Sequence, residues 1–217
     1  IGRKMNRIFD NEAGTSSAQN FFKKNKKLIL IIVSSAFLVS AIYAGSFYTN
    51  KLSNEKAAGV YNQWLDSSVL EKGDDESLYL ELVNNYPNTG YSMMAMLGKG
   101  AELAEKGSYE ESIEVLSSLK DLTNGFNGNK FFNKISRLSI ARIYLHLEQF
   151  DEALSELSSY SEESTNAYIH ELIGDIFAAK NDKTRSLEQY EFAKSKYNDQ
   201  QAASIVSMKI ANISLEQ

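Results

Sequence analysis

Cysteine is absent from the 217-residue chain, and proline occurs once, at Pro87. Without cysteine, the protein has neither a disulfide framework nor a thiolate nucleophile. Because proline interrupts helices, its scarcity predicts long unbroken helices. Histidine is scarce as well: His146 and His170 lie 24 residues apart, without the spacing of a zinc-binding motif. These shortages argue against metal and cysteine chemistry.

Two short segments resemble ligand sites but have simpler explanations. Asp74, Asp75 and Glu76 resemble part of a cation loop, but the further oxygen ligands of a calcium site are missing, so they are expected to begin a helix. Gly98 and Gly100 flank Lys99 inside a helical pattern, where close helix packing explains them better than a phosphate loop. No serine lies in a nucleophile elbow. The sequence therefore predicts a protein that is not an enzyme and that carries no metal or cofactor.

One long apolar run stands near the start of the chain. Residues 28–48 are 21 consecutive residues without a charge, and four lysines precede them: Lys23, Lys24, Lys26 and Lys27. As a helix, a run of this length rises about 31 Å, which is enough to cross the core of a bilayer. Basic residues favour the cytoplasmic side. We therefore expect a cytoplasmic basic tail over residues 1–27, a transmembrane helix over 28–48 and a periplasmic domain over 49–217.

A cleaved signal peptide over residues 23–41 is the alternative, with Val39 and Ala41 before the cut. The apolar run continues past Ala41, and Tyr43 and Tyr48 lie where an aromatic interface belt would be. The anchor is therefore favoured.

Charge divides the chain into two parts. The net charge is −5 overall, while residues 1–27 carry seven basic and two acidic residues and are positive. The acidic remainder does not fit nucleic acid as a partner, because phosphate contacts need clustered lysine and arginine. The basic tail could be a nucleic-acid arm, but it is better explained as a topology signal that rests near a lipid bilayer.

After the anchor, the apolar residues recur at helical spacing and no stretch alternates convincingly as a strand. Breaks at Gly73, Pro87, the loop 124–129 and Asn181 are among those that separate about nine predicted helices, the first continuous with the anchor. Ser108 and Glu111 have the spacing of a capping box. The predicted fold class is all-α.

A five-residue pattern recurs three times in these helices. A small residue is followed at steps of 3, 9, 4 and 3 by a large residue, a small residue and two further apolar positions. The units begin at Gly100, Ala141 and Gly174, so the offsets are 41 and 33 residues, and the loop 124–129 explains the longer one. The small residues would let two helices cross closely.

This pattern resembles the tetratricopeptide repeat, whose period is about 34 residues. We expect a helical-repeat solenoid with units near 93–120, 134–160 and 167–195, a capping helix at 200–215, and one further helix pair within 49–90 that ends at Pro87. In such repeats the first helices line a concave face. The register places nine residues on that face: Met94, Leu97, Ala101, Leu138, Arg142, His146, Tyr168, Glu171 and Asp175.

The layout also resembles a known family, the ancillary subunits of the SecYEG translocon. The resemblance rests on Phe21–Asn25 before the anchor, on Leu138–Arg142 and Lys180–Lys183 in the repeats, and on Met208–Ser214 in the last helix. The segment before residue 20 has no counterpart in that pattern. The resemblance implies a single-pass protein of the bacterial inner membrane with a periplasmic domain. Its implied partners are the SecYEG translocon, a membrane-anchored periplasmic prolyl isomerase-type chaperone and unfolded or nascent exported polypeptides, and its implied role is assistance in protein export.

Two other functions stay open at this point. A scaffold for cell division or wall assembly would use the same kind of repeat domain. A hydrolase or metalloenzyme is a distant alternative, since no residues support it.

Overall fold

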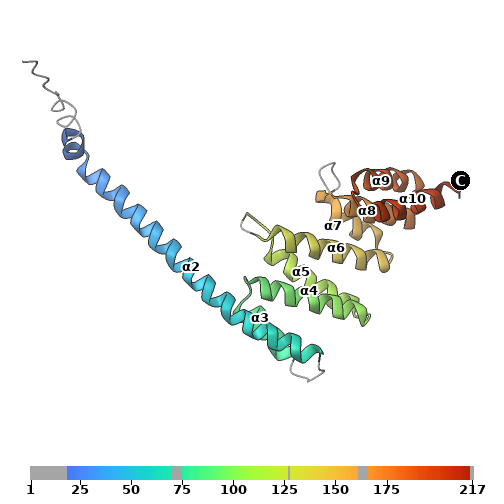
Figure 1. Ribbon diagram of the computed structural model, residues 1–217, viewed down its shortest axis with the longest axis horizontal. Coiled ribbons are helices and arrows are strands. Elements are labelled where there is room, and N and C mark those ends of the chain that lie inside the picture. The colour runs from blue at the N-terminus through green and yellow to red at the C-terminus, as the bar shows by residue number, and fades with distance from the viewer. Residues whose placement is uncertain (1–18, 70–74, 127, 161–165, 216–217) are drawn as a thin grey trace, which may run out of the picture. The chain divides into compact units, whose positions relative to one another are not determined.

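The computed structural model describes residues 19–69, 75–126, 128–160 and 166–215 (Figure 1). Within these ranges every regular element is a helix and no strand occurs, so the predicted all-α class is confirmed. The chain divides into two compact units between Ser53 and Asn54. Gly73 and Asp74, at the predicted first break, lie outside the described residues.

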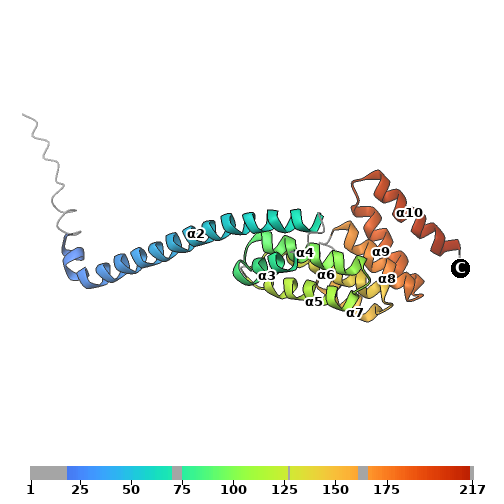
Figure 2. The same cartoon turned by 90° about the horizontal axis from the view of Figure 1, so that it is seen from below.

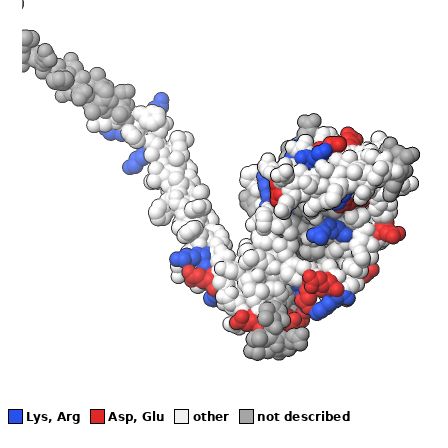
Figure 3. Space-filling model, turned by 45° about the vertical axis from the view of Figure 1, so that its right-hand side comes forward, with Lys and Arg blue, Asp and Glu red and all other residues white. Residues whose placement is uncertain are grey.

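The first unit contains the apolar run. Residues 19–24 are helical, a turn follows at Asn25, and α2 (Lys26–Val69) then continues for 44 residues. α2 is long and apolar enough to cross a membrane, and none of its most apolar stretch is buried within the protein. Figure 3 shows this stretch as a surface without charge beyond a group of basic side chains. The single apolar helix ahead of the repeats is therefore confirmed.

The second unit contains the end of α2 and the remaining helices. These are α3 (Asp75–Asn85), α4 (Gly90–Glu105), α5 (Tyr109–Leu122), α6 (Lys130–His146), α7 (Phe150–Leu157), α8 (Ala167–Ala179), α9 (Lys183–Lys196) and α10 (Gln200–Leu215). From α3 onward each helix packs mainly against its neighbour in the chain (Figures 1 and 2). This sequential packing is the arrangement of a helical-repeat solenoid.

The end of α2 forms the first part of the core. Ala57 and Trp64 are buried and belong to one cluster with Leu82 of α3 and Met96 of α4. The indole of Trp64 lies against Gly98, where an added Cβ would stand 3.0 Å from it. Gly98 therefore serves helix packing.

Two helix pairs cross at a glycine and a serine. The Ser112 hydroxyl donates to the Gly100 carbonyl at 2.6 Å, and the Ser186 hydroxyl donates to the Gly174 carbonyl at 2.9 Å. The middle pair has buried Ala141 and Ala153 at these positions. Small residues let the two helix backbones approach each other. In two of the pairs the serine hydroxyl also donates a hydrogen bond to the buried backbone carbonyl of the glycine.

The turns inside the three pairs share one conformation. Gly107, Glu148 and Asn181 have φ of +78°, +59° and +60°, and they are separated by the same 41 and 33 residues as the repeat units. The next N–H in each turn donates back to a carbonyl five residues earlier, for example from Gln149 to Tyr144 at 2.8 Å. This is the Schellman ending of a helix.

One local prediction differs from the structure. Ser108 is the N-cap of α5, but its side chain makes no capping hydrogen bond, so the predicted capping box is wrong there. Ser108 follows directly on the left-handed Gly107 and has ψ of 64°, which is not the extended conformation of most capping residues. The middle repeat unit ends in a short 3-10 helix, Ser158–Tyr160, which follows the end of α7 at Leu157.

Replacing a crossing glycine with alanine should destabilise the second unit. A Cβ at Gly100 would lie 2.7 Å from Leu116 Cγ, and a Cβ at Gly174 would lie 2.5 Å from the Tyr190 ring. We expect Gly100→Ala and Gly174→Ala to lower the free energy of unfolding by about 1–3 kcal/mol each, the usual cost of overpacking. Urea unfolding of the full chain in detergent, followed by circular dichroism, measures the change. Gly59→Ala is the matched control, because nothing lies within 4 Å of its added Cβ. Equal losses in all three variants would contradict the explanation.

Glycine at position 148 should stabilise the protein. A left-handed conformation costs most residues about 1–2 kcal/mol, part of which the greater chain entropy of glycine offsets. We therefore expect Glu148→Gly to raise the free energy of unfolding by about 0.5–1 kcal/mol and Gly107→Ala to lower it by a similar amount. Glu148→Ala retains the strain and should change little. Loss of stability in Glu148→Gly would show that the glutamate side chain matters more than its φ.

Candidate functional site

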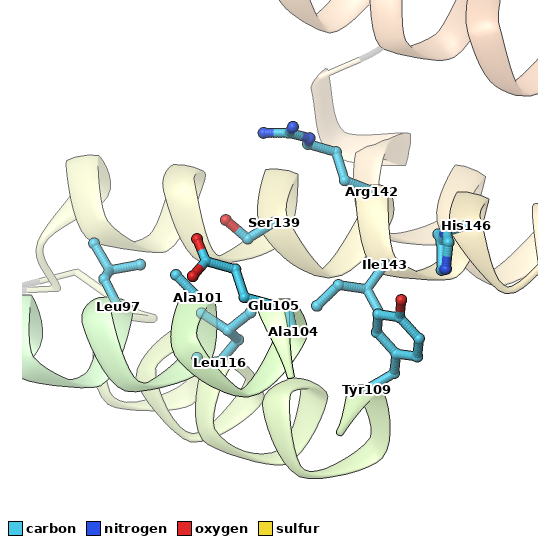
Figure 4. A pocket seen from close by; sticks show the side chains of 11 residues that line it. Leu97, Ala101, Ala104, Glu105, Tyr109, Leu116, Ser139, Arg142, Ile143 and His146 are labelled. Carbon is cyan, nitrogen blue, oxygen red and sulfur yellow. The ribbon is translucent and has the colours of Figure 1, made fainter. Parts of the chain in front are cut away.

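A groove of about 420 Å³ lies between α4, α5 and α6 (Figure 4). It is lined by Leu97, Gly100, Ala101, Ala104, Glu105, Tyr109, Leu116, Ser139, Arg142, Ile143 and His146. The first two predicted repeat units thus contribute to one concave surface.

The depth of the groove follows from small residues on α4. Gly100 allows Leu116 of α5 to pack directly against the helix backbone, and Ala101 and Ala104 leave room above it. On the opposite side, Ile143 of α6 belongs to a buried cluster with Leu116. The floor is therefore apolar and closely packed, which suits the apolar groups of a ligand.

Polar side chains surround this floor. Glu105 at the end of α4 and Arg142 one turn before the end of α6 bring opposite charges to the groove. Neither forms an ion pair with any residue in the part of the chain that the structure describes. At one end the rings of Tyr109 and His146 lie 4.8 Å apart between centroids. Charged and aromatic groups of this kind can bind backbone amides, carboxylates and basic side chains of a peptide.

Four of the nine residues predicted for the concave face line this groove: Leu97, Ala101, Arg142 and His146. Met94 is exposed on α4 but lies outside the groove, and Leu138 packs partly buried against the core cluster of α7 and α8. Tyr168, at the start of α8, is also exposed and separate from the groove.

Glu171 and Asp175 of α8 lie in a different environment. The Lys209 ammonium of α10 is 2.8 Å from a Glu171 oxygen and 2.7 Å from an Asp175 oxygen. The Tyr197 hydroxyl donates to Glu171 at 2.6 Å, and the Tyr190 hydroxyl donates to Asp175 at 2.7 Å. These two carboxylates therefore attach the last helix to the solenoid.

The pKa values of this network reflect burial and pairing. Burial raises the pKa of Glu171, but hydrogen bonds from Lys209 and Tyr197 outweigh it and hold the pKa below its usual range. Burial lowers the pKa of Lys209, but hydrogen bonds to Asp175 and Glu171 outweigh it, so that pKa is raised. The charged forms of Glu171 and Lys209 are thus favoured in the folded protein.

Seven groove residues were not predicted for the concave face: Gly100, Ala104, Glu105, Tyr109, Leu116, Ser139 and Ile143. Ala104 and Glu105 extend the face of Leu97 and Ala101 by one helical turn, so a longer register would have included them. Tyr109 is the first residue of the second helix of its pair, and a register restricted to first helices omits it.

The segments that resembled ligand sites have structural roles. Lys99 pairs with Glu76 at 2.9 Å and lies over the Tyr79 ring. His170 is buried and forms a 2.9 Å hydrogen bond with Gln189. Among the residues that the structure describes, no group of three or more histidine, aspartate or glutamate side chains could hold a metal ion.

Comparisons with known proteins agree with this architecture. The model of a family described as a tetratricopeptide repeat-like domain matches residues 19–215. A curated protein of Haemophilus influenzae, named ancillary SecYEG translocon subunit, is 23% identical over 208 residues, which cover 94% of this chain and 98% of the relative. No solved structure is significantly similar. The family resemblance predicted from the sequence is therefore confirmed.

Replacing Lys209 should loosen the last helix and change the response to acid. Because the pKa of Glu171 is lowered on folding, its contribution to stability is present above the ordinary value of 4.5 and is lost as the pH falls through the folded value. We expect Lys209→Met to lower the free energy of unfolding at pH 7 by about 1–2 kcal/mol and to weaken the loss of stability below pH 4.5. Urea unfolding between pH 3 and pH 7, about 25 °C, measures both effects.

Lys194→Met is the matched control, since Lys194 is exposed on α9 and outside this network. An unchanged acid response in Lys209→Met would contradict the assignment of Glu171 as a stabilising carboxylate.

Proposed function

We propose, since the chain belongs to the tetratricopeptide repeat-like domain family, that it is a membrane-tethered interaction protein that works beside a SecYEG-type translocon. In this proposal α2 crosses the membrane and the groove between α4 and α6 binds polypeptide. The partners are translocon subunits, exported polypeptides or a membrane-anchored chaperone of the prolyl isomerase type.

The observation that carries the proposal is the extent of the match with the translocon-named relative. The match covers nearly all of both proteins, and the family model includes the apolar helix as well as the repeats. A shared repeat alone would indicate only protein binding, because repeat folds serve many functions. A match that extends over the apolar helix as well as the repeats supports a shared location in the cell.

The lysines before the anchor support one orientation. Lys23, Lys24, Lys26 and Lys27 directly precede residues 28–48, and such clusters remain on the cytoplasmic side. The repeat domain then lies on the periplasmic side of the inner membrane. There it meets polypeptides as they leave the channel.

Attachment of the repeat domain to the membrane explains how a shallow groove can be sufficient for binding partners. A groove of about 420 Å³ accommodates a few side chains and thus supports weak binding. A domain held at the membrane beside the channel meets its partners at a high effective concentration. Weak contacts then allow both capture and release without an energy source.

Photocrosslinking in intact cells tests the proposal. A photoreactive residue in the full chain at Ala101, inside the groove, should form crosslinks to translocon subunits or to newly exported polypeptides. The same residue at Glu191, exposed on α9, should form few. Mass spectrometry of the crosslinked products identifies the partners.

A charge reversal sharpens this test. Arg142→Glu should reduce the crosslinks from Ala101 by about fivefold or more, since a groove charge acts at contact distance. Lys194→Glu makes the same charge change on α9 and should leave them unchanged. Crosslinks only to wall-synthesis proteins, or none to either class of partner, would overturn the proposal.

A further inference from the structure

A second groove lies at the start of the apolar helix, inside the first unit. It has a volume of about 360 Å³ and is lined by Phe22, Lys23, Lys26, Ile29, Leu30 and Val33. Figure 3 shows basic side chains at this end of the helix and an uncharged surface beyond them. The proposed role of the repeat domain does not involve this groove.

The turn at Asn25 shapes the groove. The backbone N–H of Asn25 donates to the Phe21 carbonyl at 3.0 Å, and its side-chain amide donates to the same oxygen at 3.1 Å. Ile29 donates to the Asn25 carbonyl at 2.9 Å, so helical hydrogen bonding continues through the turn. The lining residues recur at helical steps and share one side of the chain.

The lining of the groove is almost wholly apolar, and basic side chains stand at one end of it. Lys23 and Lys26 line its first turn with their carbon stems, and Ile29, Leu30 and Val33 continue it along α2. Both lysines are exposed, so their flexible side chains can place the ammonium groups at the rim of the groove. These three apolar side chains are not buried against the rest of the protein. A matching ligand has an acidic head and a hydrocarbon tail of at least several carbons.

We infer that this groove binds an anionic phospholipid of the cytoplasmic leaflet. The lipid phosphate lies between the Lys23 and Lys26 ammonium groups, and one acyl chain lies along Ile29, Leu30 and Val33. Long lysine side chains near the end of a membrane helix extend toward the head groups, which places their charge at this depth. The inference rests on the part of the proposed function in which α2 crosses a membrane.

The four lysines before the apolar run make it possible to distinguish a specific lipid site from general attraction to an anionic membrane surface. An anionic membrane surface attracts each lysine to a similar extent, whereas the groove is lined by Lys23 and Lys26 but not by Lys24 or Lys27. Two double variants can therefore be compared. One removes the two lysines that line the groove, and the other removes the same charge from the two lysines beside it.

The test uses the full chain in nanodiscs of equal parts phosphatidylglycerol and phosphatidylcholine, with bound lipid counted by native mass spectrometry. We expect preferential retention of phosphatidylglycerol. Lys23→Gln with Lys26→Gln should reduce that preference about tenfold, since two charge contacts to the lipid are lost. Lys24→Gln with Lys27→Gln should leave it close to the original value. Val33→Trp, which fills the groove without changing charge, should also reduce retention.

Three results would overturn the inference: equal losses in both double variants, equal retention of the two lipids, or photocrosslinks from position 33 that reach a protein helix and not lipid. Membrane insertion is measured separately by washing membranes with alkaline carbonate. A chain that washes off would refute the membrane anchor of the proposed function. A chain that stays in the membrane while both double variants behave alike would refute only the lipid site.

Discussion

The close crossing of paired helices is the constraint on which the rest of the repeat domain depends. At Gly100 and Gly174 the facing side chain occupies the space that a Cβ would need. Ser112 and Ser186 then donate hydrogen bonds to the buried carbonyls of these two glycines. This approach sets the distance between the helices of a pair, and that distance decides how the next pair stacks. A larger residue at the crossing would therefore displace the second helix of the pair and disturb the helix that packs against it.

This constraint also explains why much of the fold could be predicted from the sequence. A crossing that admits only small residues leaves them at fixed intervals, and the turn between the helices repeats at the same offsets. Capping was less predictable. Ser108 has the right spacing but the wrong backbone conformation, since the preceding Gly107 already ends α4 in a left-handed turn. Whether a side chain caps a helix depends on ψ, which a residue pattern does not show.

The candidate site was only partly predictable, because it depends on three helices rather than one register. Repeat spacing identified Leu97, Ala101, Arg142 and His146, but not Tyr109, which a second helix contributes. The third unit shows the opposite problem. Glu171 has the spacing of a concave-face residue, yet its partner Lys209 lies 38 residues later. Nothing local to α8 indicates that a later helix will bind that carboxylate.

The groove of the first two units and the ion-pair network of the third unit suggest that the two ends of the repeat domain have different roles. Lys209 pairs with both carboxylates of α8, so this end of the solenoid holds α10 in place. The groove of the first two units instead keeps Arg142 and Glu105 without an ion pair in the described part of the chain, and charges left in this way are available to a partner. A closing helix covers the apolar end of a solenoid and so stabilises it. The third unit with α10 therefore contributes stability, whereas the groove of the first two units is the part that can bind a partner.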